Sequence, residues 1–125
     1  MIQPRIIDVK DEAKQNTFFR KVRYTAAKTQ LVIMSLLPGE EIGTEAHDGD
    51  QLLYAVKGQG VAVINGVRQP LEKGSVVCVP MGIMHNVINT GEDALKLFTI
   101  YAPPQHAAGT VQATKEEAEA AEVGA

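Results

Sequence analysis

The sequence predicts an all-β domain, a sandwich or a barrel, from three observations. Short runs rich in β-branched and aromatic residues recur roughly every 8–12 residues through the middle of the chain. Turn-forming residues separate these runs, and no intervening segment is long enough for the crossover helix of a βαβ unit. The expected strands, in order, cover residues 18–24, 30–37, 43–47, 51–57, 60–64, 67–71, 75–79, 85–89 and 95–101.

Turn signals mark the ends of most of these strands. Asn65-Gly66 predicts a hairpin between the fifth and sixth strands, because both residues tolerate positive φ. The other turn signals are Pro38-Gly39, Asp48-Gly49, Gly58, Lys73-Gly74, Pro80 to Gly82, and Thr90-Gly91.

The two ends of the chain differ from the strand-rich centre. Residues 8–16 are polar and predict either a helical turn or a loop. Residues 102–110 are expected to be extended, since a residue before proline avoids the α region. The tail that follows is rich in alanine and glutamate and opens with a capping box, Thr114 and then Glu117, which predicts a short C-terminal helix.

Length and composition indicate one domain and argue against several partners. The chain has 125 residues, 45% hydrophobic and 22% charged, close to the average globular protein. We expect a single domain over residues 1–125, with the core barrel over about 18–102 and a tail over 103–125. A net charge of −3 without a basic stripe makes nucleic acid a poor candidate partner.

The chain carries no visible membrane or secretion signal. No apolar run approaches the ~18 residues of a membrane span, and the N-terminus lacks the charged-then-apolar order of a signal peptide. Cys78 is the single cysteine, which excludes an internal disulfide and fits a reducing compartment. These features predict a soluble cytoplasmic protein that handles a small-molecule substrate or ligand.

Four polar residues of the strand-rich centre are candidate metal ligands. Alternation along a strand sends Glu45 and His47 to the same face. A carboxylate and an imidazole facing an apolar interior are costly unless something pairs with them, and a divalent cation would do so. Gln51 and His85 lie at spacings that the same barrel could bring close to that pair.

These residues sit in two motifs that resemble the cupin family. Its first motif is G, five residues, H-x-H, three or four residues, E, six residues, G. This chain has the same spacing in Gly39, Glu45-x-His47, Gln51 and Gly58. Its second motif is G, five residues, P-x-G, two residues, H, three residues, N. That motif is matched without a gap by Gly74, Pro80, Gly82, His85 and Asn89.

The resemblance implies a double-stranded β-helix, a jelly-roll barrel with one divalent metal ion in its mouth. It implies Glu45, His47, Gln51 and His85 as the ligands, and a homodimer. The family's usual set is three histidines and one glutamate, so this chain exchanges one nitrogen donor for oxygen while keeping one carboxylate. Such a set suits manganese, iron, cobalt, nickel or zinc.

Three functions remain open at the level of the sequence. Two histidines and one carboxylate are the ligands of non-haem iron oxygenases, which favours a dioxygenase-like enzyme acting on a small organic substrate. The same four residue types, with Glu and Gln exchanged, occur in zinc-dependent phosphomannose isomerases, so a sugar or sugar-phosphate isomerase is the first alternative. The second is a module that binds a metal or small ligand without catalysis. No residue stands out as a general base.

Other residues are assigned to packing or to the surface. On the strand 30–37 the inward set is either Gln30, Val32 and Met34 or Leu31, Ile33 and Ser35. Candidates for the remaining pocket walls are Met81, Met84, Phe98 and Ile100. Few charges lie near this pocket, which favours a weakly polar substrate. We expect Cys78 to be buried, His106 to be exposed or at a partner contact, and Arg20 and Arg23 to stack or pair at a subunit surface.

Overall fold

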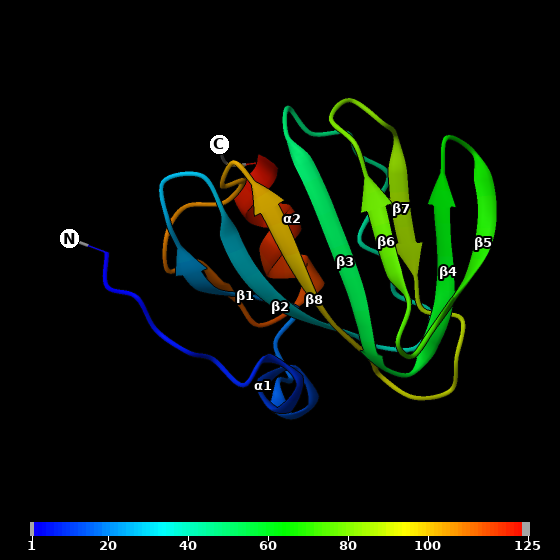
Figure 1. Cartoon of the computed structure of the whole chain (residues 1–125). Helices are drawn as coiled ribbons and strands as arrows, with labels where there is room; N and C mark the ends of the chain where they lie inside the picture. Colours follow the sequence, from blue (N-terminus) through cyan, green and yellow to red (C-terminus); the bar gives the residue numbers. More distant parts are fainter. Residues whose placement is uncertain (1, 124–125) are drawn as a thin grey trace.

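Two antiparallel sheets face each other in the computed structural model, which describes residues 2–123 (Figure 1). The larger sheet has the strand order β6-β3-β8-β2-β1-β9, and the smaller has the order β5-β4-β7. This architecture confirms the all-β jelly-roll barrel with a short C-terminal helix that the sequence predicts.

The strands follow the predicted order, except that residues 43–47 form no continuous strand and a short strand β9 is added in the tail. Helix α1 forms within residues 8–16, where the sequence leaves a helical turn or a loop open. The elements are α1 Val9–Gln15, β1 Arg20–Thr25, β2 Gln30–Leu36, β3 Asp50–Lys57, β4 Gln59–Ile64, β5 Val67–Glu72, β6 Val76–Val79, β7 His85–Ile88, β8 Leu95–Ala102, β9 Val111–Gln112 and α2 Lys115–Val123.

Strict alternation along the strands builds the core between the sheets. In β8 every second side chain from Leu95 to Tyr101 is buried, as expected for a strand with one face on the core. In β2 the inward residues are Gln30, Val32 and Met34, which decides between the two sets that the sequence leaves open. The core also contains Leu53 and Ala55 from β3, in phase with Gln51.

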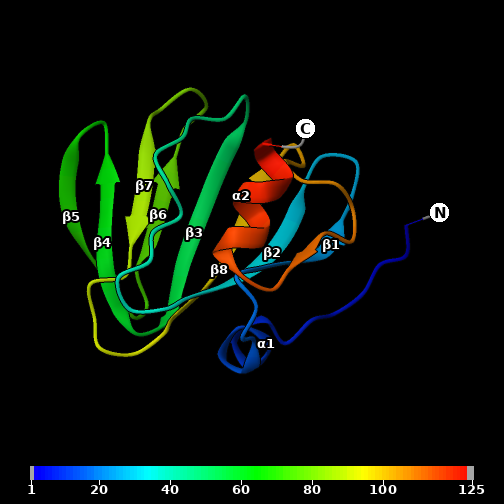
Figure 2. The same cartoon turned by 180° about the vertical axis from the view of Figure 1, so that it is seen from behind.

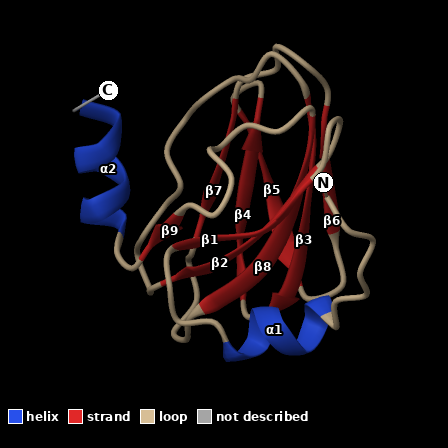
Figure 3. Cartoon of the chain, turned by 90° about the vertical axis from the view of Figure 1, so that its left-hand side faces the viewer, coloured by secondary structure: helices blue, strands red, loops and turns tan. Residues whose placement is uncertain are grey.

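Helix α1 covers the outer face of the larger sheet. Its buried Ala13 packs with Ile33 and Val56, and Figure 3 shows the helix lying across one end of the sheet. Phe98 stacks on Tyr54 in this outer cluster, with ring centroids 5.1 Å apart. The expectation that Phe98 lines the inner pocket is therefore wrong, because it has the opposite parity to the inward residues of β8.

Helix α2 begins at the capping box. The Thr114 hydroxyl accepts a hydrogen bond from the backbone nitrogen of Glu117 at 3.1 Å, and the Glu117 carboxylate accepts one from the nitrogen of Ala113 at 2.7 Å. Ala118 joins the core between the sheets, and Figure 2 shows the helix in front of β2. Neither helix that the structure describes has the length and hydropathy needed to cross a bilayer.

The approach of β4 to β7 gives a first testable prediction. A Cβ atom on Gly60 would lie 2.3 Å from the carbonyl oxygen of Ile88, so Gly60→Ala has to displace backbone between two paired strands. We expect a loss of at least about 3 kcal/mol in the free energy of unfolding, measured by urea titration.

Gly66→Ala is the matched control. Gly66 has φ +81 and open space around its Cβ position, so the substitution should cost only the ~1–2 kcal/mol of left-handed backbone. Equal losses for the two variants would contradict the close approach at Gly60.

Candidate metal centre

Reciprocal backbone hydrogen bonds hold Glu45 opposite His85. The nitrogen of Glu45 donates to the oxygen of His85 at 3.0 Å, and the nitrogen of His85 donates to the oxygen of Glu45 at 2.9 Å. Side chains of directly opposed antiparallel residues project to the same face. This pairing joins the two sequence motifs at the barrel mouth.

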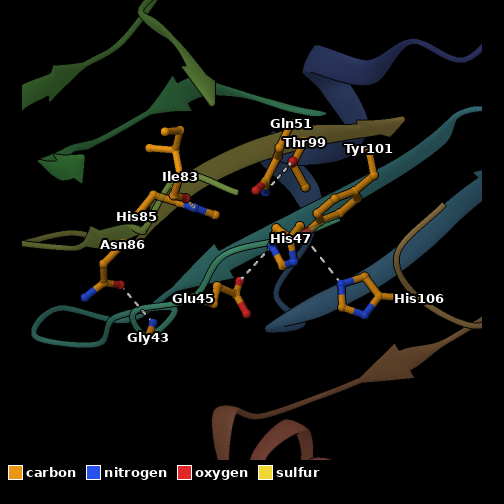
Figure 4. Close-up of polar contacts among 10 residues, drawn as sticks. All are labelled: Gly43, Glu45, His47, Gln51, Ile83, His85, Asn86, Thr99, Tyr101 and His106. Carbon is orange, nitrogen blue, oxygen red and sulfur yellow. Dashed lines mark hydrogen bonds and ion pairs between the residues drawn. The ribbon is translucent and has the colours of Figure 1, made fainter. Parts of the chain in front are cut away.

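The strand predicted over residues 43–47 is reduced to the single bridge at Glu45. A second isolated bridge, at Glu41, lies just before this range, and no continuous strand forms. Gly43, at φ +111, interrupts the extended backbone between the two bridges. The Asn86 side chain accepts a hydrogen bond from the Gly43 nitrogen at 2.8 Å, which fixes the bend (Figure 4).

His47 completes a group of three donors. Its imidazole lies on the same face as Glu45, as the i, i+2 spacing predicts, and its Nε2 is 3.3 Å from Glu45 Oε1. The His47 and His85 ring centroids are 5.2 Å apart. One ligand atom from each of Glu45, His47 and His85 lies within 4.8 Å of the other two.

Gln51 extends toward the same space from β3 (Figure 4). Its side chain is only 3% exposed, and its Nε2 donates to the hydroxyl of Thr99 on the neighbouring strand at 3.0 Å. That bond orients the amide group and leaves its oxygen, Oε1, available as a metal ligand. Thr99 is itself fully buried.

Within residues 2–123, two of the expected ligand atoms, Gln51 Oε1 and His85 Nε2, are buried without a hydrogen-bond partner. A third, His47 Nε2, is also buried, and it contacts only the Glu45 carboxylate, at 3.3 Å. Buried polar atoms are nearly always paired, because an unpaired one keeps its full desolvation cost. A bound cation would satisfy such atoms.

The backbone hydrogen bond of His85 leaves its other ring nitrogen available to a cation. Its Nδ1 lies 2.9 Å from the carbonyl oxygen of Ile83, which can only accept a hydrogen bond. In the neutral ring Nδ1 therefore carries the proton, and Nε2 presents a lone pair. A backbone contact of this kind is the usual outer support of a metal-bound histidine.

The charge of Glu45 also fits a cation. Burial alone would raise the pKa of its carboxyl group, but the neighbouring His47 imidazole and the charge of Arg20 outweigh burial, and the pKa is lowered. The carboxylate is thus anionic beside two imidazole nitrogens. Ligand atoms that share an ion at ~2.1 Å lie about 3–4 Å apart, so small side-chain movements would let these donors hold one divalent metal.

Two residues beyond the expected four line the same space. Tyr101 is buried, and its ring packs edge-on against His47 with centroids 5.5 Å apart. His106 follows, with its Nε2 3.4 Å from the Tyr101 hydroxyl (Figure 4). Burial raises the pKa of the Tyr101 hydroxyl far above its ordinary value, so the phenol stays neutral.

His106 is half-buried within the chain instead of exposed, and its alternative role at a partner contact stays a prediction. Burial, followed by the charge of Arg20, lowers its pKa to about 4. The buried Gln30 side chain holds the backbone of His106 in place, since Gln30 Nε2 donates to its oxygen at 2.7 Å. Gln30 is the one signal of this contact in the sequence, because a polar side chain at an inward position of a strand needs a hydrogen-bond partner.

Arg20 stacks as expected, with its guanidinium carbon 5.3 Å from the centroid of the Phe19 ring, but it is 4% exposed and does not lie at a surface. Arg23 of the same strand pairs with Glu12 of this chain at 2.6 Å. The expectation that Cys78 is buried is wrong. Cys78 is exposed, because its neighbours Val77 and Val79 take the inward positions of β6.

The remaining candidates for the pocket walls lie outside the core. Met81 and Met84 are exposed, and Ile100 takes the outward parity of β8.

The family model of the cupin domain matches residues 32–101, more than half of the chain and the span that carries Glu45, His47, Gln51 and His85. The chain belongs to the cupin family. Among the relatives of this cupin is uncharacterized protein YrkC of Bacillus subtilis, 41% identical over 96% of this chain and 68% of its own length. Another is an oxalate-binding protein of Thermotoga maritima, 32% identical over 54% of this chain and 56% of its own length.

Solved structures give the same fold. BH2720 of Bacillus halodurans superposes with a TM-score of 0.92 and 38% identity, covering 94% of this cupin and 95% of that chain. Salicylate 1,2-dioxygenase of Pseudoaminobacter salicylatoxidans, solved as adducts with gentisate, has a TM-score of 0.56 and 25% identity, covering 60% of this cupin and 20% of that chain.

The environment of His106 predicts a pH-dependent stability. Its pKa in the folded state, about 4, lies below its ordinary 6.5, so the unfolded chain binds the proton more readily. The stabilisation is complete above pH 6.5 and is lost as the pH falls from there toward 4. Urea titration of metal-free protein should show a loss at pH 5, relative to pH 7.5, of which His106 contributes ~1 kcal/mol after discounting its partial exposure.

His106→Gln is the comparison variant, because glutamine does not titrate and can still reach the Tyr101 hydroxyl. The variant should lose less stability than the wild type between the two pH values. The groups that act on His106 and remain in both proteins are Arg20, Glu45, His47 and Tyr101. An unchanged pH dependence would contradict the burial of the neutral imidazole.

Proposed function

We propose that this cupin is a metal-dependent enzyme that holds one divalent transition metal ion and acts on a small organic substrate. The ligands in this proposal are Glu45, His47, Gln51 and His85. The observation that supports it is the pair of buried, unpartnered atoms Gln51 Oε1 and His85 Nε2, together with the His47 imidazole 3.3 Å from the anionic Glu45 carboxylate. A divalent ion would satisfy all of them at once.

The donor set favours oxidative chemistry over the alternatives. Two imidazoles and one carboxylate make the facial set of non-haem iron oxygenases, which leave coordination positions for substrate and oxygen. The amide of Gln51 is a weak fourth donor. Iron or manganese would supply redox and Lewis-acid chemistry when bound. The likeness to a gentisate-binding dioxygenase supports the same choice.

The chain's own residues define what such a reaction can use. Thr99 orients the Gln51 amide, and the Ile83 carbonyl orients His85, so the donors are positioned before an ion binds. Tyr101 offers a neutral hydroxyl donor, and His106 is neutral at pH 7 and can accept a proton. His47 and His85 are largely shielded from solvent, whereas the Glu45 side chain stays 31% exposed at the barrel mouth.

Glu45→Gln tests the metal site. The substitution keeps the size of the side chain and removes the only anionic donor of the set, so we expect affinity for Mn(II) to fall about tenfold or more. The measurement is equilibrium dialysis of the full chain against Mn(II), followed by elemental analysis.

Glu41→Gln is the matched control for that experiment. Glu41 lies on the same segment and also forms an isolated bridge, but its carboxylate accepts from Asn86 at 3.2 Å and stands outside the donor group. We expect it to bind Mn(II) as the wild type does. Equal affinities for Glu45→Gln and the wild type would exclude Glu45 as a ligand.

Oxygen uptake separates the enzyme hypotheses. Iron-loaded protein should consume oxygen with a member of a panel of diketones, catechols and flavonols, and Glu45→Gln should abolish the uptake. Oxygen-independent exchange between an aldose and a ketose by zinc-loaded protein would instead support the isomerase. Tight ligand binding with no turnover in either assay would support a binding module.

A further inference from the structure

Arg20 is a buried cation that faces the interior of the barrel. It is the first residue of β1, and Val22, two positions along the same strand, belongs to the core between the sheets. Residues i and i+2 of a strand share a face. The guanidinium therefore points into the same interior as the candidate metal centre.

The charge of Arg20 has no counter-ion in the part of the chain that the structure describes. Its Nη1 donates to the side-chain oxygen of Gln112 at 2.7 Å, its Nε has no partner, and no carboxylate of residues 2–123 lies within ion-pair distance of it. A buried guanidinium without an anion carries a desolvation cost of several kcal/mol. An anionic binding partner would offset this cost.

Arg20 is buried on the inward face of β1, and its charge reaches the metal donors. Its positive charge acts on the ionisation of Glu45, Tyr101 and His106. From His47 the rings of Tyr101 and His106 follow one another at centroid distances of 5.5 and 5.3 Å.

His106 is held firmly at the end of this row of rings. Gln30 is 1% exposed, and its Oε1 accepts hydrogen bonds from the backbone nitrogens of Gln105 and His106 at 3.1 and 3.0 Å. The tail is thereby fixed against the strand that faces the interior. A rigid wall of this kind can position a ligand without an ordering cost on binding.

We propose that Arg20, with the Tyr101 hydroxyl, binds the carboxylate of a small organic acid whose other end reaches the metal donors. This inference rests on the proposed function and names its substrate class. With a divalent ion bound, Arg20 and the ion together contribute three positive charges, and Glu45 contributes one negative charge. The site then has a net charge of +2, which an anionic substrate would partly neutralise. A weakly polar substrate, favoured from the sequence, would leave Arg20 unpaired.

The shape of the guanidinium favours carboxylate over phosphate. With Nη1 bound to Gln112, the unpartnered Nε lies on an edge of the planar group that can contact both oxygens of a carboxylate. Arg20 is the one arginine or lysine among the buried residues of 2–123, and a phosphate dianion usually recruits more than one such cation.

Isothermal titration calorimetry with matched probes tests the proposal. The full-length protein is stripped with 1,10-phenanthroline, which carries no carboxylate of its own, and titrated with malonate against malonamide and benzoate against benzamide. At least one acid should bind about tenfold or more tightly than its amide. Arg20→Gln should remove that preference, and Arg20→Lys should keep part of it.

Arg23→Gln is the control for charge alone. It removes one positive charge from the same strand, at a side chain that pairs with Glu12 on the other face, and should keep the preference for the acids. Equal binding of acids and amides by the wild type overturns the proposal, as does a preference that survives Arg20→Gln or disappears in Arg23→Gln. If Arg20→Gln fails to fold, the proposal is tested by the preference of the wild type for acids over amides and by the partial loss of that preference in Arg20→Lys.

The same samples separate this inference from the proposed function. If metal-free protein binds neither acid nor amide, the titration is repeated on Mn(II)-loaded protein, and the same failure there overturns the proposal. Mn(II) retained by the wild type without a preference for acids leaves the metal site standing and removes the anion site. A preference for acids in a protein that holds no Mn(II) supports the anion site and removes the metal site.

Discussion

The pairing of Glu45 with His85 is the contact on which the candidate site depends. Two backbone hydrogen bonds join the segment after β2 to the start of β7 and bring a carboxylate and an imidazole to one face. His47 then follows by strand parity, and Gln51 arrives from the opposite sheet with its amide oriented by Thr99. Without this pairing the two motifs would contribute donors to separate edges of the barrel.

The interior around this contact combines apolar packing with an unusual density of polar groups. Val87 and Leu97 belong to the apolar core. Among residues 2–123, the buried Arg20 guanidinium has no counter-ion within ion-pair distance, and Gln51 Oε1 and His85 Nε2 are buried without hydrogen-bond partners. Each such group lowers the stability of the empty protein. A metal ion and an anionic substrate would offset these costs together, so stability and function are expected to be coupled through ligand binding.

The fold could be predicted because alternation and turn chemistry act locally. The hairpin at Asn65-Gly66 and the inward phase of Gln51, Leu53 and Ala55 follow from neighbouring residues alone. Arg20 and His106 could not be placed in this way, since they reach the site from the first strand and the tail through tertiary contacts with Gln112 and Gln30. The homodimer and the cytoplasmic location stay predictions.

The most direct test of a shared metal ion is a crystal structure of the full chain soaked in Mn(II), with anomalous data collected for the metal. The account predicts a single anomalous peak at ~2.0–2.3 Å from a carboxylate oxygen of Glu45 and from Nε2 of His47 and His85, with Gln51 Oε1 as the remaining protein donor. A peak bound elsewhere, or donors that stay empty at saturating Mn(II), would contradict it.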